Sequence, residues 1–422
     1  MKNDLKNILT NKNYLFILNL VLWLALAFVL PWQTKLILRP ALSNYWEISL
    51  FLVMPICFSL LIIHLILNIR SLKRIILPKI LTISFSLFLI SMVMIFFLAL
   101  DPILSWYHYF WILLFLITLT SFHKLKKKWQ LYILLALLIS LLIQAGIGIF
   151  QFLDQKSFAS TFLGMSFHDV SQAGVSVIET ASGRYLRAYG PLDHPNVFGG
   201  LMSIAAIVSA YLYARRDNKY WRLFAIFSYS IFNLALLASF SRASILAFFL
   251  GMLFFLLENR QKLRRIIILA LVSLLIIISF SFRYHELVFS RFERSNRLET
   301  ISINERAVYN KLAWESFKEK PILGSGLANS TLDLYQTDSQ NDQEKAIWNY
   351  QPAHNYWLLL LTEGGIILFS SFLLFYIFAY QKSRSNRLLG IFICFFILTL
   401  FDHWLLSLPL ASVLPLFWII FI

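Results

Sequence analysis

The chain alternates between long apolar runs and short polar connectors. Twelve runs approach the roughly 20 residues that a helix needs to cross a bilayer. Because the eighth and the twelfth are short, the pattern predicts eleven or twelve spanning helices. We therefore predict an all-α integral membrane protein that forms one polytopic domain over residues 1–422. The runs are 14–31, 49–68, 80–100, 105–122, 130–152, 196–214, 222–240, 243–257, 266–282, 355–380, 388–405 and 408–422.

The distribution of positive charge predicts how these helices are oriented. Six short segments on one side hold 22 Lys and Arg residues, whereas the short connectors on the other side hold only Lys35, Arg39 and Arg242. Lys and Arg are enriched in cytoplasmic loops, and short loops carry this signal best. We therefore expect both termini in the cytoplasm. The six segments are 1–13, 70–79, 123–129, 215–222, 258–265 and 381–387.

Two long polar segments, 153–195 and 283–353, fall on the extracytoplasmic side of this topology. The short connectors have little room for a binding or catalytic site, so we expect the functional residues in these two loops. The second loop is predicted to be partly helical. Ser302 and Glu305 have the spacing of a capping box, and Pro321 would end a helix over residues 303–319.

The composition supports a chain surrounded by lipid. Apolar residues make up 59% of the chain and charged residues 14%, against roughly 45–50% and about 25% in soluble domains. The net charge of +16 could indicate nucleic-acid binding. However, the basic residues form short clusters between apolar runs, as cytoplasmic loops require. We therefore expect membrane lipid as a partner and no nucleic acid.

Polar motifs occur at four places on the predicted extracytoplasmic side: residues 184–196, 241–242, 304–326 and 352–355. Arg242 lies in a connector of a few residues between two apolar runs, where a guanidinium is costly unless it is solvated or paired. It is either an interfacial cation or a ligand for an anion at the membrane surface. Arginines gathered on one face can grip phosphate oxygens in bidentate fashion. Other candidates are Arg184, Arg187, His194 and Asn196 in the first of these motifs, 184–196, and Arg306 in the third, 304–326.

Histidines supply a candidate general base. His354, followed by Asn355, stands at the predicted start of a helix, and the positive end of the helix dipole favours a neutral imidazole there. It is either a base or a residue that caps the helix. Asp402 and His403 lie together in the last predicted extracytoplasmic hairpin, as a pair that supports the site or as a solvated turn.

Several motifs of metal and nucleotide chemistry are absent from the sequence. It contains no Asp-x-Asp, no Gly-rich phosphate loop and no H-E-x-x-H. The spacing of the His and acidic residues does not predict a metal site. We therefore expect neither a metal nor another cofactor.

Taken in order, the polar motifs resemble the O-antigen ligase and O-antigen polymerase family of bacterial envelope glycosyltransferases. The resemblance extends over about residues 140–380. The matching stretches are R-A-Y-G-P-L-D-H-P-N-V-F-G-G from Arg187, S-F-S-R-A-S from Ser239, N-E-R-A-V-Y-N-K-L-A-W from Asn304, P-I-L-G-S-G from Pro321 and H-N-Y-W-L-L-L-L-T-E-G-G from His354.

This resemblance implies metal-independent transfer of a glycan from a polyprenyl-diphosphate carrier to a sugar hydroxyl, outside the cytoplasmic membrane. It implies that Arg242, Arg306 and His354 are essential and that Arg187 is a further arginine of the site. The family often has Asn where this chain has His194, so the chain departs from the pattern there.

Three alternatives stay open at this point. The acceptor is a growing chain in a polymerase, and lipid A-core or another acceptor in a ligase; the sequence does not separate the two. A flippase for lipid-linked oligosaccharides is a different class of protein. It would favour a central polar cavity and internal repeats, whereas the polar residues here are concentrated in two outer loops.

Overall fold

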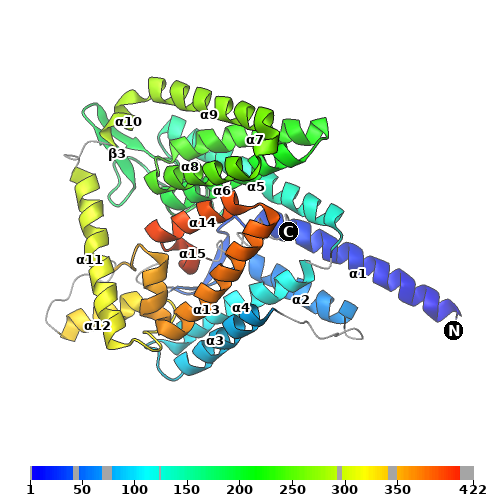
Figure 1. Cartoon of the computed structure of the whole chain (residues 1–422). Coiled ribbons are helices and arrows are strands. Elements are labelled where there is room, and N and C mark those ends of the chain that lie inside the picture. The colour runs from blue at the N-terminus through cyan, green and yellow to red at the C-terminus, as the bar shows by residue number, and fades with distance from the viewer. Residues whose placement is uncertain are drawn as a thin grey trace.

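The computed structural model describes residues 2–40, 47–68, 78–122, 125–291, 297–340 and 349–408. These residues are mostly helical (Figure 1). Within them, each of the first eleven predicted apolar segments contains a helix, and the twelfth, 408–422, lies almost wholly outside them. Five helices are long and apolar enough to cross a membrane, which indicates a multi-pass membrane protein. These are α5 (Lys127–Asp154), α6 (Pro195–Arg215), α7 (Lys219–Ala238), α9 (Leu263–Arg283) and α13 (Tyr356–Asn386).

Helix α6 forms the centre of the core, because nearly all of its side chains are buried. It packs against α7 and α8, and α14 joins this group to α13 by contacting both α8 and α13. Figure 1 shows α14 between the upper helices α6–α9 and the lower helices α3, α4 and α13. The further apolar helices are α1 (Lys2–Val29), α2 (Val53–Asn68), α3 (Lys79–Ile95), α4 (Pro102–Phe122), α8 (Arg242–Glu258) and α14 (Leu389–Phe401).

The prediction of an all-α fold is wrong in one respect, because two antiparallel hairpins are present. Strands β1 (Lys35–Arg39) and β2 (Ile48–Phe51) pair in the connector between α1 and α2. Strands β3 (Val177–Thr180) and β4 (Gly183–Leu186) pair in the first long loop. Outside helices, backbone N–H and C=O groups still need partners, and a short hairpin supplies them. Neither hairpin is long enough to stand out in the hydrophobic pattern.

The second long loop contains three helices: α10 (His285–Ser290), α11 (Arg297–Glu319) and α12 (Ser330–Gln340). The predicted helix over 303–319 is confirmed as α11, but it begins at Arg297, so the expected capping box at Ser302 is wrong. In Figure 1, α11 runs along one edge of the molecule from α10 to α12, at the opposite end from the N-terminus of α1.

The P-I-L-G-S-G turn packs directly on a kink in α13. Gly365 interrupts the helix with a φ of +58°, and a Cβ there would lie 2.3 Å from the carbonyl carbon of Ile322. The backbones are hydrogen-bonded across this contact, from Ile366 N to Pro321 O at 2.9 Å and from Gly326 N to Glu363 O at 2.8 Å. Glycine is required because only it combines this φ with such a close backbone approach.

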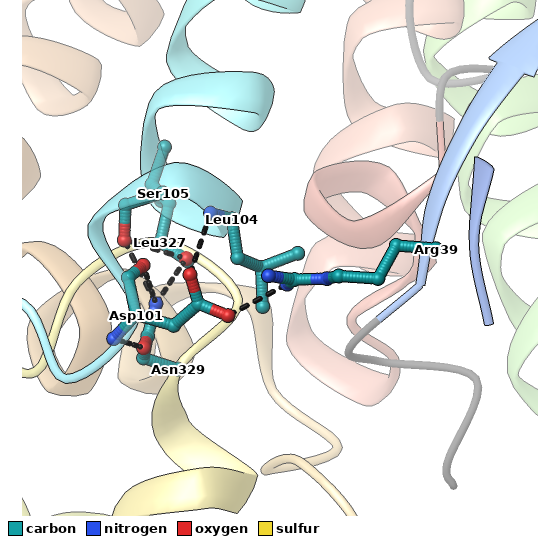
Figure 2. Close-up of polar contacts among 6 residues, drawn as sticks. All are labelled: Arg39, Asp101, Leu104, Ser105, Leu327 and Asn329. Atoms are coloured by element: carbon teal, nitrogen blue, oxygen red, sulfur yellow. Dashed lines mark hydrogen bonds and ion pairs between the residues drawn. The ribbon is translucent and has the colours of Figure 1, made fainter. Parts of the chain in front are cut away.

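A polar network ties the first hairpin to the second long loop (Figure 2). Arg39 Nη2 of β1 lies 2.6 Å from Asp101 Oδ2, just before α4. The backbone N–H of Asp101 donates to Asn329 Oδ1 at 2.7 Å, and Asn329 Nδ2 donates to Ser105 Oγ at 2.8 Å. Segments more than 200 residues apart in sequence are thereby held against one another.

Candidate functional site

A cavity of about 850 Å³ opens among the connectors that the sequence predicts to be extracytoplasmic. This volume is near the upper end of the roughly 300–1,000 Å³ typical of small-ligand sites. Its walls come from the β1–β2 hairpin, the first long loop, the α7–α8 turn, α11, the entry to α13 and the segment after α14. Eight of the residues singled out from the sequence line it: Arg187, His194, Asn196, Arg242, Arg306, His354, Asp402 and His403.

The turn between α7 and α8 organises the arginines. Phe240 has a φ of +48°, unusual for a residue with a side chain; such strain persists when the surroundings hold it in place. The carbonyl oxygen of Ser239 accepts from Arg187 Nε at 2.8 Å, and that of Phe240 accepts from Arg291 Nη2 at 3.1 Å. Two carbonyls of one turn therefore position two guanidiniums, and the next helix begins with a third at Arg242.

Small residues let α6 approach this turn. A Cβ at Gly199 would lie 2.5 Å from Ser239 Oγ and 3.0 Å from Ser241 Cβ. Ser241 Oγ and Ser244 Oγ are within hydrogen-bonding distance of each other, at 2.8 Å. The small residues of the S-F-S-R-A-S motif thus allow the turn to pack closely on α6, and the same motif places Arg242 at the start of α8.

Arg187 is buried, with 5% of its surface exposed. Besides Ser239 O, it donates to Ser176 Oγ and Asn196 Oδ1, each at 2.8 Å. These three acceptors are uncharged, so its hydrogen bonds do not neutralise its charge. Burial, together with the positive charges of Arg306 and Arg242, lowers the pKa of Arg187 to about 10.

Arg291 is a fourth guanidinium in the cavity wall. Burial, together with the positive charges of Arg187, Arg242 and Arg306, lowers its pKa to about 8. Arg242 is exposed, and its Nη1 donates to the carbonyl oxygen of Arg291 at 3.3 Å. Arg187, Arg242, Arg291 and Arg306 repel one another, and an anion that enters among them would relieve that repulsion.

His354 lies beside an acidic group. Its Nδ1 is 4.0 Å from Asp402 Oδ1 and, among the described residues, has no hydrogen-bond partner. Burial lowers the pKa of His354 to about 4; His403 and Arg306 lower it and Asp402 raises it. The imidazole is therefore neutral at neutral pH, chiefly because it is buried.

Asp402 is the acidic centre of a histidine group. Burial alone would raise the pKa of this carboxyl, but His403, His354 and His194 together hold it below its usual value. The ring centroid of His403 lies 5.3 Å from that of His354. Ligand atoms of His354, Asp402 and His403 all lie within 4.8 Å of one another, a grouping of metal-ligand types that the sequence spacing did not indicate.

His194 and Asn196 begin α6. His194 Nδ1 accepts from the backbone N–H of Asn196 at 3.1 Å and so caps the helix. His194 is exposed to the cavity yet enclosed by protein atoms. This enclosure lowers its pKa to about 3, assisted by the charges of Arg187 and Arg306.

Two of the sequence candidates are not among the residues that line the cavity. Arg184 lies on β4, where its Nε is 3.6 Å from Glu179 Oε1. Asn355 caps α13 by accepting from the backbone N–H of Leu358 at 2.9 Å, and it donates to Leu400 O at 3.1 Å. Its contacts position the helix that follows His354.

Six charged residues of the cavity wall were not singled out as site candidates from the sequence: Lys35, Glu47, Asp193, Arg291, Glu305 and Glu363. Arg291 belongs to no recognised motif, and only its place in the second long loop could have indicated it. Asp193 lies inside a quoted motif, beside His194. Lys35 and Glu47 belong to the hairpin that the hydrophobic pattern did not predict.

Comparison with known proteins identifies one matching family. Residues 225–373 match the family described as O-Antigen ligase, which confirms the predicted resemblance over that segment. The match includes Arg242, Arg291, Arg306 and His354, and it implies transfer of a lipid-linked glycan. A search of curated proteins found no match.

Proposed function

We propose that this chain transfers a glycan from a polyprenyl-diphosphate carrier to a sugar hydroxyl on the extracytoplasmic side of the membrane. The observation that carries the proposal is the single cavity lined by Arg187, Arg242, Arg306 and His354. Such a site combines ligands for an anionic leaving group with a base for an acceptor hydroxyl.

The arginines are proposed to bind the diphosphate. As the bond between the anomeric carbon and the phosphate oxygen breaks, negative charge grows on the departing diphosphate. Preorganised cations stabilise a transition state where this charge develops, and most strongly in a site of low dielectric. Arg187 and Arg291 are fixed by the α7–α8 turn, whereas Arg242 and Arg306 line the cavity with more freedom to adjust.

His354 is proposed to activate the acceptor. Its lowered pKa supplies the neutral imidazole that a base requires. Asp402 Oδ1, 4.0 Å from Nδ1, favours a proton on that nitrogen. Nε2, which lies 3.4 Å from Gln351 Oε1, would then take up the proton once the acceptor hydroxyl replaces Gln351 as its partner. The acceptor oxygen then bonds to the anomeric carbon, its proton passes to Nε2, and the lipid diphosphate departs as an anion.

We propose that this reaction proceeds without a metal. Two tetrahedral ligands with bonds of about 2.1 Å would lie roughly 3.4 Å apart, whereas His354 Nδ1 and Asp402 Oδ1 are 4.0 Å apart. Arg306 is near enough to lower the pKa of His354, so its charge would also repel a dication there. The arginines supply the positive charge that a metal provides in other transferases.

The proposed side of the membrane rests on the distribution of charge. The basic short segments lie on the other side of the predicted topology from the two long loops, and the cavity is built from those loops and their neighbouring connectors. A carrier anchored by its lipid tail would present its diphosphate at this level, beside Arg242 at the start of α8.

The experiment is reconstitution of the purified protein in liposomes with lipid-linked oligosaccharide extracted from the membranes of the source cell. Longer lipid-linked chains identify a polymerase, and transfer to a different glycolipid identifies a ligase. Movement across the bilayer without a new glycosidic bond would instead identify a flippase and overturn the proposal. His354→Ala should lose at least about 100-fold in rate, and full activity of that variant would refute its role as base.

A further inference from the structure

The cavity has a second polar wall that the proposed reaction does not use. Lys35 of β1, Glu47 just before β2, and Asp193 just before α6 all line it. Tyr107 of α4 fixes the hairpin in place, because its hydroxyl donates to the carbonyl oxygen of Ser49 at 2.7 Å. This wall comes from elements other than those that supply the arginines.

Asp193 and His194, although adjacent, face different groups. The charges that act on Asp193 are those of Lys35, Glu47 and His168. Those that act on His194 belong to Arg187, Asp402, His354 and Arg306. We call the part of the cavity wall around Lys35, Glu47 and Asp193 the carboxylate side. The part around the arginines and His194 is the arginine side, and His354 belongs to it because Arg306 acts on both histidines.

The carboxylate side is negative overall. Lys35 Nζ lies 2.9 Å from Glu47 Oε1, so these two charges largely compensate each other. Asp193 is exposed to the cavity but surrounded by protein, and that enclosure raises the pKa of its carboxyl. With His168 neutral because burial lowers its pKa, Asp193 contributes the uncompensated charge.

We propose that Lys35, Glu47 and Asp193 form the subsite for the acceptor sugar, and that it favours an acceptor without negative charge. This inference rests on the proposed glycan transfer. Carboxylates accept hydrogen bonds from sugar hydroxyls, and an ammonium donates to ring or hydroxyl oxygens. An acidic or phosphorylated sugar would meet the charge of Asp193, whereas the donor diphosphate is drawn to the arginines. The cavity thereby sorts its two substrates by charge.

The test measures donor and acceptor kinetics separately for Asp193→Asn. The donor is radiolabelled lipid-linked oligosaccharide of one repeat. The acceptor is the unlabelled fraction that receives label from the wild-type protein, either multi-repeat lipid-linked glycan or envelope glycolipid. We expect the acceptor KM to rise about tenfold or more, as for loss of a charged hydrogen-bond partner, with the donor KM unchanged. Asp169→Asn, the same change at a half-buried position of the same loop that is not among the residues lining the cavity, should leave both constants unchanged.

A second arm tests the selection by charge. Oxidising the primary hydroxyls of the acceptor to carboxylates should raise its KM for the wild-type protein by at least about tenfold, and by less for Asp193→Asn. If Asp193→Asn fails to fold, Glu47→Gln is tested instead, and the same changes in acceptor KM and donor KM are expected. An unchanged acceptor KM, or equal rises for donor and acceptor, would overturn the subsite. Absence of transfer by the wild-type protein would instead overturn the proposed function, and the subsite with it.

Discussion

Replacing Arg242 with glutamine tests the proposed diphosphate site with little disturbance of the fold. The Arg242 side chain is exposed, and its Nη1 contacts the Arg291 carbonyl at a long 3.3 Å, so stability should change by no more than about 0.5 kcal/mol. A hydrogen bond to a charged group contributes about 1.5–3 kcal/mol. Its loss in the transition state corresponds to a fall in kcat/KM of about 10- to 150-fold.

The assay is initial-rate transfer from radiolabelled lipid-linked oligosaccharide, with the donor varied at a fixed acceptor concentration. Arg242→Lys should fall between wild type and Arg242→Gln, because lysine keeps the charge but loses the two-pronged geometry. Arg184→Gln is the matched control, since Arg184 is paired with Glu179 and is not among the residues lining the cavity. A kcat/KM for Arg242→Gln within about twofold of wild type, or an equal loss for Arg184→Gln, would refute the reasoning.

Three further predictions concern pH, metal and packing. With a His354 pKa of about 4, transfer should be constant from neutral pH down to about pH 5 and fall below it as the base is protonated; an acidic limb centred near 6.5 would contradict this. Dialysis against EDTA should leave the rate unchanged, and a loss restored by one divalent metal would show that the cluster around His354 binds that ion. Gly365→Ala should destabilise the protein by about 2–5 kcal/mol through left-handed backbone strain and contact with Ile322. Gly146→Ala, in open space on α5, should be neutral or raise the unfolding temperature; similar melting curves for the two variants would contradict the packing argument.

The helices were predictable because each is a long apolar run, and a run of that length has few alternatives in lipid. The hairpins were not, since strands of four or five residues in short connectors leave almost no periodic signal. The start of α11 was misjudged for a related reason. Ser302 and Glu305 have the spacing of a cap, but the helix continues to Arg297, and spacing alone cannot exclude a longer helix.

The arginines and His354 were predictable as candidates because charge on the extracytoplasmic side is scarce and the motifs contain it. Their grouping was not, because Arg187 and Arg291 are positioned by carbonyls of a turn far from them in the sequence. Arg184 and Arg187 stand in the same polar motif, and only the family resemblance singled out Arg187. Arg184 lies on β4 and is paired with Glu179. Arg187 directly follows that strand and is buried.

The most direct test of the account is a structure of the protein with polyprenyl diphosphate bound in a lipid nanodisc. The account predicts that the diphosphate lies in the cavity, with its oxygens about 3 Å from nitrogens of Arg242 and Arg306. The end that would carry the glycan should then face His354. A diphosphate bound at the opposite, basic side of the membrane, or in the cavity without contact to these arginines, would contradict it.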